Sequence, residues 1–373
     1  MKVAVIGWSP FDVGPALAAD LALAGHEVHF APWPDQGAML ETILRNGGLD
    51  VVGGTGETIS GGSGRAPVAS IGMDIAQAVA GAEVVLVDCA PPELEARMPS
   101  LIPHLERGQV VHVNSHGYFV VLRLLPLLAA AGKQGVLLTE STSPILAAGV
   151  KDGVVTPHVV RRHVDTATFP GNRIGEALPR LQALYKGFGP AESILQTSLE
   201  SMNLMGHAGL ALANVGAFDR AEAEGRGFAF YTRGNIKSAS ILTEAFGAER
   251  NAVCRAYGVR ENSARERLIY LYDSHGNTHQ EAVANCAFLQ NLGELPAGIW
   301  RRWLSVDVPY AIVPTVRLAE AAGVGAPVLR SIAEIFGVLL GFDPWKTGLT
   351  LEQLGLAGLT PTEVARLARE GAV

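Results

Sequence analysis

Short apolar runs alternate with helical periodicity over the first 160 residues of the chain. The runs at 3–6, 84–87 and 110–113 are continuous, as expected for strands that are buried on both faces. Between them, residues 16–24 and 120–131 follow the period of a helix. This alternation predicts an α/β domain of the Rossmann type, a doubly wound parallel sheet with right-handed crossovers.

Long helical periods replace this alternation after about residue 171, and strand signals almost vanish. They cover 174–185, 204–224, 235–257, 282–292, 313–322 and 326–340. We therefore predict two domains, an α/β domain of the Rossmann type at 1–175 and an all-α domain at 176–373. In the first domain we further expect strands at 27–30 and 135–139, helices at 39–46, 74–80 and 92–107, and a loop or hairpin at 53–63.

Composition and charge narrow the function classes. The 373 residues include 29 basic and 36 acidic side chains, so the net charge of −7 argues against a nucleic-acid partner. The cysteines at 89, 254 and 286 form neither a disulfide framework nor a zinc pattern, which favours a reducing compartment and a cytoplasmic location. The apolar stretch at 15–25 is too short to span a membrane, so we expect no membrane partner.

The turn after the first strand is the expected place for dinucleotide binding, because backbone amides at a helix N-terminus bind pyrophosphate. Gly7 and Gly14 fit this pattern, but Ser9 stands where a second glycine is usual, and Asp12 would repel a phosphate. A domain of this fold that binds another ligand, or none, is the alternative.

The second predicted strand ends without the acidic residue that binds the adenosine ribose in NAD enzymes. The first acid after it is Asp35, and Arg45 and Arg65 are more distant candidates for a 2′-phosphate. We therefore predict NADP as the cofactor, with NAD as the alternative. Residues that follow the third and fourth core strands are further candidates for cofactor binding: Ala90, Pro91, Asn114 and His116.

Two segments of the helical domain carry candidate chemistry. Asn203 and His207 lie four residues apart and share one face of a helix, and Arg302 and Asp307 lie about 100 residues further on. A histidine can donate a proton near neutral pH, a carboxylate can hold its tautomer, and an arginine fork can bind a substrate carboxylate. The alternatives are a packed histidine, a helix N-cap at Asp307 and a solvated arginine.

His275 and His279 also lie four residues apart, as metal ligands on a helix do. Gly276 follows His275 directly, so a continuous helix is not expected there. We predict a loop near the substrate entrance and no metal site.

The sequence resembles the opine dehydrogenases, also called the octopine/nopaline dehydrogenase family. The resemblance rests on 197–199 with Asn203 and His207, on Arg302, on Asp307-Val308-Pro309-Tyr310 with Val313-Pro314, and on 348–356. It extends over nearly the whole chain, and the glycine loop is its weakest part.

The resemblance implies an NAD(P)H-dependent oxidoreductase that joins the amine of an amino acid to a 2-oxo acid and reduces the imine to an N-(carboxyalkyl) amino acid. It implies His207 as the acid/base, Asp307 as the residue that orients it, and Asn203, Arg302 and Tyr310 as substrate-binding residues. The active site is then expected in the cleft between the domains, and a homodimer is left open.

Two other functions remain as alternatives. A reductase of the related ketopantoate or hydroxyacid type would reduce C=O. Such enzymes typically have a catalytic lysine early in the helical domain, whereas here His207 stands at that position and the nearest lysine is Lys237. The second alternative is a non-enzymatic sensor that uses the altered glycine loop, in which Ser9 and Asp12 depart from the usual pattern.

Overall fold

An eight-stranded sheet forms the centre of the first compact unit of this computed structural model, which comprises Met1–Ser115 and Val120–Ile194. The structure describes residues 1–10, 13–52 and 60–372. In spatial order the strands are β12 (Phe188–Pro190), β11 (Val164–Thr168), β8 (Leu137–Ser141), β7 (Val110–Val113), β6 (Val84–Val87), β1 (Lys2–Ile6), β2 (Glu27–Ala31) and β5 (Ser70–Ile71). All neighbours pair in parallel except β8 and β11.

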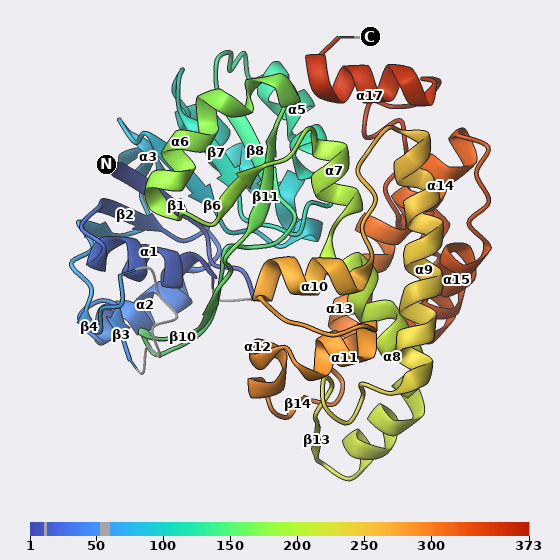
Figure 1. Cartoon of the computed structure of the whole chain (residues 1–373). Helices are drawn as coiled ribbons and strands as arrows, with labels where there is room; N and C mark the ends of the chain where they lie inside the picture. The colour runs from blue at the N-terminus through green and yellow to red at the C-terminus, as the bar shows by residue number, and fades with distance from the viewer. Residues whose placement is uncertain (11–12, 53–59, 373) are drawn as a thin grey trace. The chain divides into compact units, whose positions relative to one another are not determined.

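The strand order reverses between β1 and β6, as in a doubly wound sheet, and Figure 1 shows helices on both faces of this sheet. The helices of this unit are α1 (Val13–Leu23), α2 (Gly37–Arg45), α3 (Ile75–Val79), α4 (Leu94–Arg97), α5 (Val120–Ala130) and α6 (Ile174–Leu184), with 3-10 turns at Pro91–Glu93, Met98–Ser100, Ile102–His104 and Gly171–Arg173. The predicted fold class is confirmed.

A second, smaller sheet of the same unit was not predicted. It contains β4 (Gly64–Arg65), β3 (Asp50–Val51), β10 (Val154–Val160) and β9 (Leu146–Lys151) in that order. Pro157 lies where the β9–β10 register shifts, so the strand continues past a residue that normally interrupts pairing. Strand β11 was also missed, because polar residues such as Asp165 and Thr166 alternate with apolar ones although every residue of the strand is buried.

Two predicted helices are wrong in detail. The helix expected at 92–107 is broken into α4 and short 3-10 turns, because Pro99 and Pro103 cannot supply the amide hydrogen that a continuous helix needs. The helix expected at 282–292 is two short helices that meet at Asn285 and Cys286. The segment 53–63 lies mostly outside the described residues.

The second compact unit comprises His116–Phe119 and Leu195–Val373 and is helical, as expected. Its helices are α7 (Ile194–Leu199), α8 (Met202–Ala223), α9 (Lys237–Ala256), α10 (Ala264–Tyr272), α11 (His279–Ala284), α12 (Ala287–Asn291), α13 (Ile299–Asp307), α14 (Val313–Ala321), α15 (Pro327–Leu340), α16 (Pro344–Thr347) and α17 (Pro361–Glu370), with a π-helical turn at Val308–Ile312. The strands β13 (Gly227–Phe228) and β14 (Leu295–Pro296) add a two-stranded ribbon. No described helix has both the length and the apolar character that crossing a bilayer requires.

The compact units divide after Ile194, later in the chain than the predicted boundary at residue 175. The reason is that α6 packs against β11 and β12, so the segment between the predicted and the observed division belongs to the large sheet. The short segment His116–Phe119 is the other departure from the predicted division, because it leaves β7 and packs in the helical unit.

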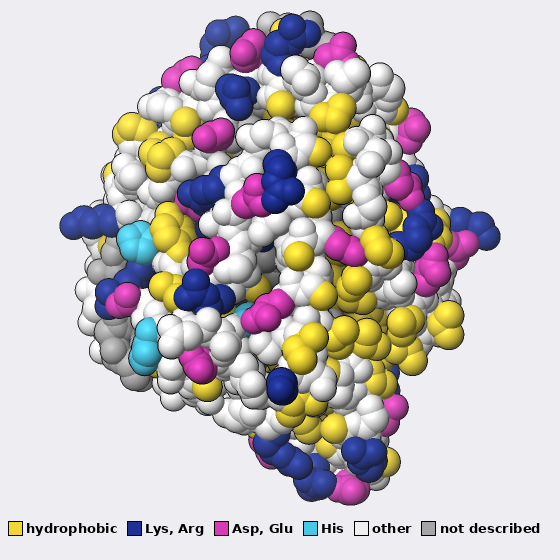
Figure 2. Space-filling view, turned by 45° about the vertical axis from the view of Figure 1, so that its right-hand side comes forward, with side chains coloured by type: hydrophobic (Ala, Val, Ile, Leu, Met, Phe, Trp, Pro, Cys, Tyr) yellow, Lys and Arg dark blue, Asp and Glu magenta, His cyan; other side chains and the backbone are white. Residues whose placement is uncertain are grey.

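Apolar side chains gather on the surface that Figure 2 turns toward the viewer. On α15, the residues Ile335, Val338 and Leu339 are exposed, Val338 by 83%. They lie three or four residues apart and therefore share one face of the helix.

The turn between β1 and α1 requires both of its glycines. Gly7 has a φ of +93°, and a Cβ there would collide with the Asp88 carbonyl and the Trp33 ring. A Cβ at Gly14 would collide with the Gly7 carbonyl. Asp88, at the end of β6 and 2% exposed, accepts hydrogen bonds on Oδ2 from the amides of Ser9 (2.8 Å) and Gly14 (2.7 Å). A carboxylate from a neighbouring strand thus caps the start of α1, where the helix dipole favours negative charge.

This cap predicts a large loss of stability on substitution. Asp88→Ala leaves two buried amides without that acceptor, so we expect the free energy of unfolding to fall by about 2–4 kcal/mol. Asp88→Asn keeps one carbonyl oxygen and should lose less. The matched control is Asp74→Ala, which removes the exposed cap of α3 and should cost about 1 kcal/mol. Urea unfolding followed by circular dichroism measures all three, and equal losses for Asp88→Ala and Asp74→Ala would contradict the assignment.

His112 of β7 predicts a pH dependence of stability. Its side chain is buried, Nδ1 lies 2.9 Å from the Thr139 hydroxyl, and burial lowers its pKa from 6.5 to about 3. Between the two pKa values, the unfolded chain binds more protons at His112 than the folded chain does. The stability that neutral, buried His112 contributes is therefore fully present above pH 6.5 and is lost as the pH falls below it. From pH 7.5 to 5 the loss should be about 2 kcal/mol.

The measurement is urea unfolding at both pH values. His112→Gln should reduce the difference in unfolding free energy by about that amount, whereas His158→Ala, at an exposed histidine, should leave it unchanged. An unchanged difference in His112→Gln would show that His112 is not the group that titrates.

Candidate active site

The carboxylate of Asp307 accepts hydrogen bonds on both oxygens in the helical unit. His207 Nδ1 lies 2.8 Å from Oδ2, and the Tyr118 hydroxyl donates to Oδ1 at 2.6 Å. Asn203 Nδ2 donates in turn to the Tyr118 oxygen at 3.2 Å. Asp307 is 1% exposed, so these donors replace the water that a carboxylate would otherwise bind. The contact between His207 and Asp307 that the sequence predicted is therefore present.

Local backbone structure sets the position of Asp307. It is the last residue of α13 and directly precedes the π-helical turn, but its side chain makes no capping hydrogen bond there, so the alternative of an N-cap side chain is not observed. Pro309 has no amide hydrogen, and the chain passes through a π-helical turn before α14 begins. Trp303 lies one turn before Asp307 on the same face, and its ring stacks on His207 with centroids 4.4 Å apart and an interplanar angle of 12°. The imidazole is thus held by a hydrogen bond at its edge and a ring on its face.

Tyr118 was not singled out by the sequence, although its neighbours Asn114 and His116 were candidates for cofactor binding. Gly117, Tyr118 and Phe119 have φ values of 77°, 59° and 55°, a conformation that residues other than glycine rarely adopt. The Phe119 amide donates to the Ser198 hydroxyl at 2.8 Å, which ties this strained segment to α7. A Cβ at Gly117 would collide with the Thr197 carbonyl, so only glycine fits there.

The electrostatics of the network keep Tyr118 a hydrogen-bond donor. Burial, followed by the nearby Asp307 carboxylate, raises the pKa of Tyr118 well above its usual range. With Nδ1 of His207 directed to the Asp307 carboxylate, Nε2 is the ring nitrogen through which the imidazole can exchange a proton with another group. His207 and Asn203 both line a cavity of about 70 Å³ whose further walls come from α10, α11 and α12.

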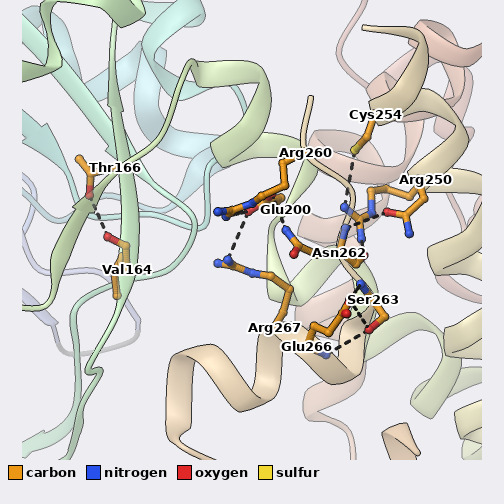
Figure 3. Close-up of polar contacts among 11 residues, drawn as sticks. Val164, Thr166, Glu200, Arg250, Cys254, Arg260, Asn262, Ser263, Glu266 and Arg267 are labelled. Atoms are coloured by element: carbon orange, nitrogen blue, oxygen red, sulfur yellow. Dashed lines mark hydrogen bonds and ion pairs between the residues drawn. The ribbon is translucent and has the colours of Figure 1, made fainter. Parts of the chain in front are cut away.

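Glu200 was also missed, and it fixes one wall of this cavity. Its fully buried carboxylate lies at the junction of α7 and α8, and Figure 3 shows several donors that converge on it. Arg260 donates from Nε (3.1 Å) and Nη2 (2.9 Å), Asn262 donates at 2.6 Å, and Arg267 Nη1 lies 3.2 Å away. Because Arg267 belongs to α10, this ion pair holds α10 beside the start of α8, where Asn203 lies.

The other predicted substrate-binding residues lie outside this network. Arg302 is exposed on α13, and its position in the helix is rotated away from the face that carries Trp303 and Asp307. Tyr310 is half-buried in the π-helical turn. Neither lines the cavity beside His207.

Most predicted cofactor residues meet at one edge of the large sheet. The turn with Gly7, Ser9 and Gly14 follows β1, Ala90 and Pro91 follow β6, and Asn114 follows β7, and these three strands are neighbours. Asn114 is 4% exposed, and its Nδ2 has no hydrogen-bond partner. His116, two residues after Asn114, is assigned to the helical unit, where its ring centroid lies 6.1 Å from that of Tyr118. Asp12 lies outside the described residues.

Of the charged residues considered for binding the adenosine part of the cofactor, Asp35 and Arg65 are engaged in ion pairs. Asp35 binds Arg97 at 2.9 Å, and Arg65 binds Asp50 at 2.9 Å. Arg45 is exposed at the end of α2.

The histidines at 275 and 279 do not share a helix. His279 begins α11, and Gly276 between them has a φ of 148°. Among the described residues, no group of three or more potential metal ligands comes together.

Comparison with known proteins agrees with the resemblance. Residues 190–340 match the family model described as NAD/NADP octopine/nopaline dehydrogenase, alpha-helical domain. The opine dehydrogenase of Arthrobacter sp. (strain 1C) is 28% identical over 349 residues, which is 93% of each chain.

Solved structures extend the likeness in fold to both units. An octopine dehydrogenase solved with NADH and L-arginine aligns with a TM-score of 0.73 at 17% identity, over 99% of this chain and 98% of the other. A yersinopine dehydrogenase with bound NADP+ aligns with a TM-score of 0.64 at 16% identity, over 95% and 97%. The chain therefore resembles the opine dehydrogenases over nearly its whole length, and its residues 190–340 match the α-helical domain of that family.

Proposed function

We propose that this chain catalyses the NAD(P)H-dependent reductive condensation of an amino acid with a 2-oxo acid to an N-(carboxyalkyl) amino acid. The observation that carries the proposal is the 2.8 Å contact between His207 and the buried Asp307, beside a cavity, in a chain that resembles the opine dehydrogenases. The amine attacks the 2-oxo carbon and water leaves to give an imine. Addition of a hydride to the imine carbon and of a proton to its nitrogen then gives the secondary amine.

His207 performs the proton transfers in this scheme. As a neutral base it accepts the proton that the attacking amine loses, and as an acid it returns a proton to the departing hydroxyl. Asp307 holds the Nδ1–H tautomer and stabilises the imidazolium between these events. Tyr118 occupies the second carboxylate oxygen, which stops Asp307 from rotating away from the imidazole. Asp307 and Tyr118 are thus positioning residues, because they act through His207.

Residues at the carboxyl ends of β1, β6 and β7 are proposed to hold the dinucleotide, which supplies the hydride when bound. The unpartnered Nδ2 of buried Asn114 fits a polar group of a ligand at this edge. The Ser9 and Gly14 amides are already bound to Asp88, so we expect the pyrophosphate to bind other groups of the turn. Gly7, Ala90, Pro91 and His116 complete the proposed cofactor set.

Substrate carboxylates are proposed to bind Arg302, with Asn203 and Tyr310 as neighbours. Arg302 is exposed, and the planar fork of its guanidinium matches the shape of a carboxylate.

The chemistry at position 207 argues against a reductase of the ketopantoate type. Lys237, the nearest lysine in sequence, is exposed at the start of α9 and does not line the cavity. A sensor without activity would not need a buried carboxylate that orients a histidine beside a cavity.

Location and assembly complete the proposal. The three cysteines are free and buried, which fits a reducing compartment, and we propose the cytoplasm. We further propose a homodimer in which a second copy covers the exposed face of Ile335, Val338 and Leu339 on α15.

Substitutions at the network test the proposed roles. His207→Ala should reduce kcat by about 10²–10⁴-fold, the usual effect of a lost acid/base, with almost unchanged NADPH binding. Asp307→Asn and Tyr118→Phe should reduce kcat less and shift the lower limb of the pH profile, because they alter only how the imidazole is held. Arg302→Ala should mainly raise KM for the carboxylate substrate.

Steady-state kinetics with NADPH, an amino acid and pyruvate measure these effects, and His158→Ala is the matched histidine control. Wild-type turnover in His207→Ala would refute the proposal. It would also be refuted if the wild-type protein binds NADPH, as a sensor would, but oxidises no NADPH with any pair of amino acid and 2-oxo acid.

Cofactor preference follows from the end of β2, where Ala31 stands instead of an acid, and from the engagement of Asp35 by Arg97. We expect NADPH to bind at least as tightly as NADH. Fluorescence titration of the apoprotein with each cofactor measures both dissociation constants. A clear preference for NADH would contradict this expectation, and Asp35→Ala would then show whether that acid reaches the ribose.

A further inference from the structure

The cavity beside His207 has an apolar wall. Side chains from four helices and from the segment after β13 surround it, and those that carry carbon surface are Leu210, Tyr231, Leu268, Tyr272, Val283 and Leu289. All of them belong to the helical unit. Asn203 and His207 are also lining residues of the cavity, so a substrate group that binds there lies beside the histidine that we propose as the acid/base.

The described lining residues include no lysine, arginine, aspartate or glutamate. An ammonium, guanidinium or carboxylate group placed there would lose its hydration without meeting an opposite charge, which costs several kcal/mol. An aliphatic or aromatic group would instead gain about 25 cal/mol for each Å² that it removes from water. The cavity should therefore bind uncharged groups more tightly than charged ones.

His279 is a polar residue in this wall that does not belong to the network, as are Tyr231 and Tyr272 with their hydroxyl groups. It begins α11, is 7% exposed, and its Nδ1 has no hydrogen-bond partner. Burial lowers its pKa to about 4, so the ring is neutral at pH 7 and offers one donor and one acceptor. A buried nitrogen of this kind is expected to meet a ligand atom.

We propose that this cavity receives the side chain of the amino substrate and selects an uncharged, chiefly apolar side chain, to which His279 can donate or accept one hydrogen bond. The inference rests on the proposed function. The amino acid is the partner assigned to the cavity because the methyl group of the smallest 2-oxo acids would leave most of its 70 Å³ empty. A side chain of four or more heavy atoms, as in leucine, methionine or glutamine, would occupy it.

The test is a substrate panel with the full-length enzyme and saturating NADPH. With pyruvate fixed, kcat/KM for leucine, methionine and phenylalanine should exceed that for lysine, arginine and glutamate by about 100-fold or more, from the penalty of an unpaired buried charge. Comparable or higher values for a charged amino acid would overturn the inference while leaving the proposed function intact. Absence of turnover with every pair would overturn the proposed function and the inference with it.

Two variants test whether the selectivity for the amino acid side chain arises in the cavity. Val283→Phe fills space, so it should raise KM for leucine about tenfold or more relative to KM for alanine. The matched control Ile241→Phe adds the same ring at an exposed position of α9 and should leave that ratio unchanged. A Val283→Phe enzyme that loses discrimination among 2-oxo acids instead of amino acids would overturn the assignment of the cavity to the amino substrate.

The role of His279 needs a readout that a structural role would not move. His279→Leu should lower kcat/KM for glutamine about tenfold relative to leucine, because only glutamine has a polar group to bond. His279→Asn keeps a donor and an acceptor and should restore part of that ratio. Equal losses for both substrates in His279→Leu would show that the ring only supports α11.

Discussion

A buried carboxylate must be hydrogen-bonded on both oxygens, and the arrangement of the helical unit around Asp307 follows from that constraint. One oxygen takes the imidazole of His207 from α8, and the other takes the hydroxyl of Tyr118 from the segment that leaves β7. Loss of either donor would leave a charge partly uncompensated at a site that is 1% exposed, which typically costs 3–5 kcal/mol for a buried pair. Three segments distant in sequence are thereby held in one geometry.

The backbone around the network is irregular where this geometry demands it. Tyr118 and Phe119 adopt left-handed conformations, and α13 gives way to a π-helical turn directly after Asp307. Such conformations cost free energy and persist only where surrounding contacts over-determine them. Here the contacts are the Ser198 hydroxyl on the Phe119 amide and the Trp303 ring on the imidazole. Strain and a π-turn at one carboxylate are the physical signs of a site built for precise placement.

A carboxylate also organises the nucleotide unit. Asp88 binds the amides of Ser9 and Gly14, so the chain provides its own anion at the start of α1. Ser9, which stands where a dinucleotide-binding turn usually has its second glycine, is held by its amide against Asp88. In both units, and again at Glu200, a buried acid with several donors joins segments that the sequence separates widely.

The sequence by itself determined the features that depend on periodicity and short-range geometry. Continuous apolar runs indicated the buried parallel strands, helical periods indicated the second unit, and the four-residue spacing of Asn203 and His207 indicated a shared face. It failed where local signals conflict with tertiary packing, as in β11, whose polar residues are buried by the strands and helices beside them, and at 92–107, where prolines break the expected helix.

Only the tertiary structure decided which residues meet. Tyr118 and Asp307 are 189 positions apart and Asp88 and Gly14 are 74 positions apart, and no periodicity records such contacts. The cavity is likewise a property of packing, since its wall combines side chains from α8, α10, α11 and α12 that each look like ordinary core residues in the sequence. The hydrophobic pattern of the sequence therefore determines where helices and strands form. Which of their side chains come into contact depends on hydrogen-bonding the buried charges and on filling the space between the elements.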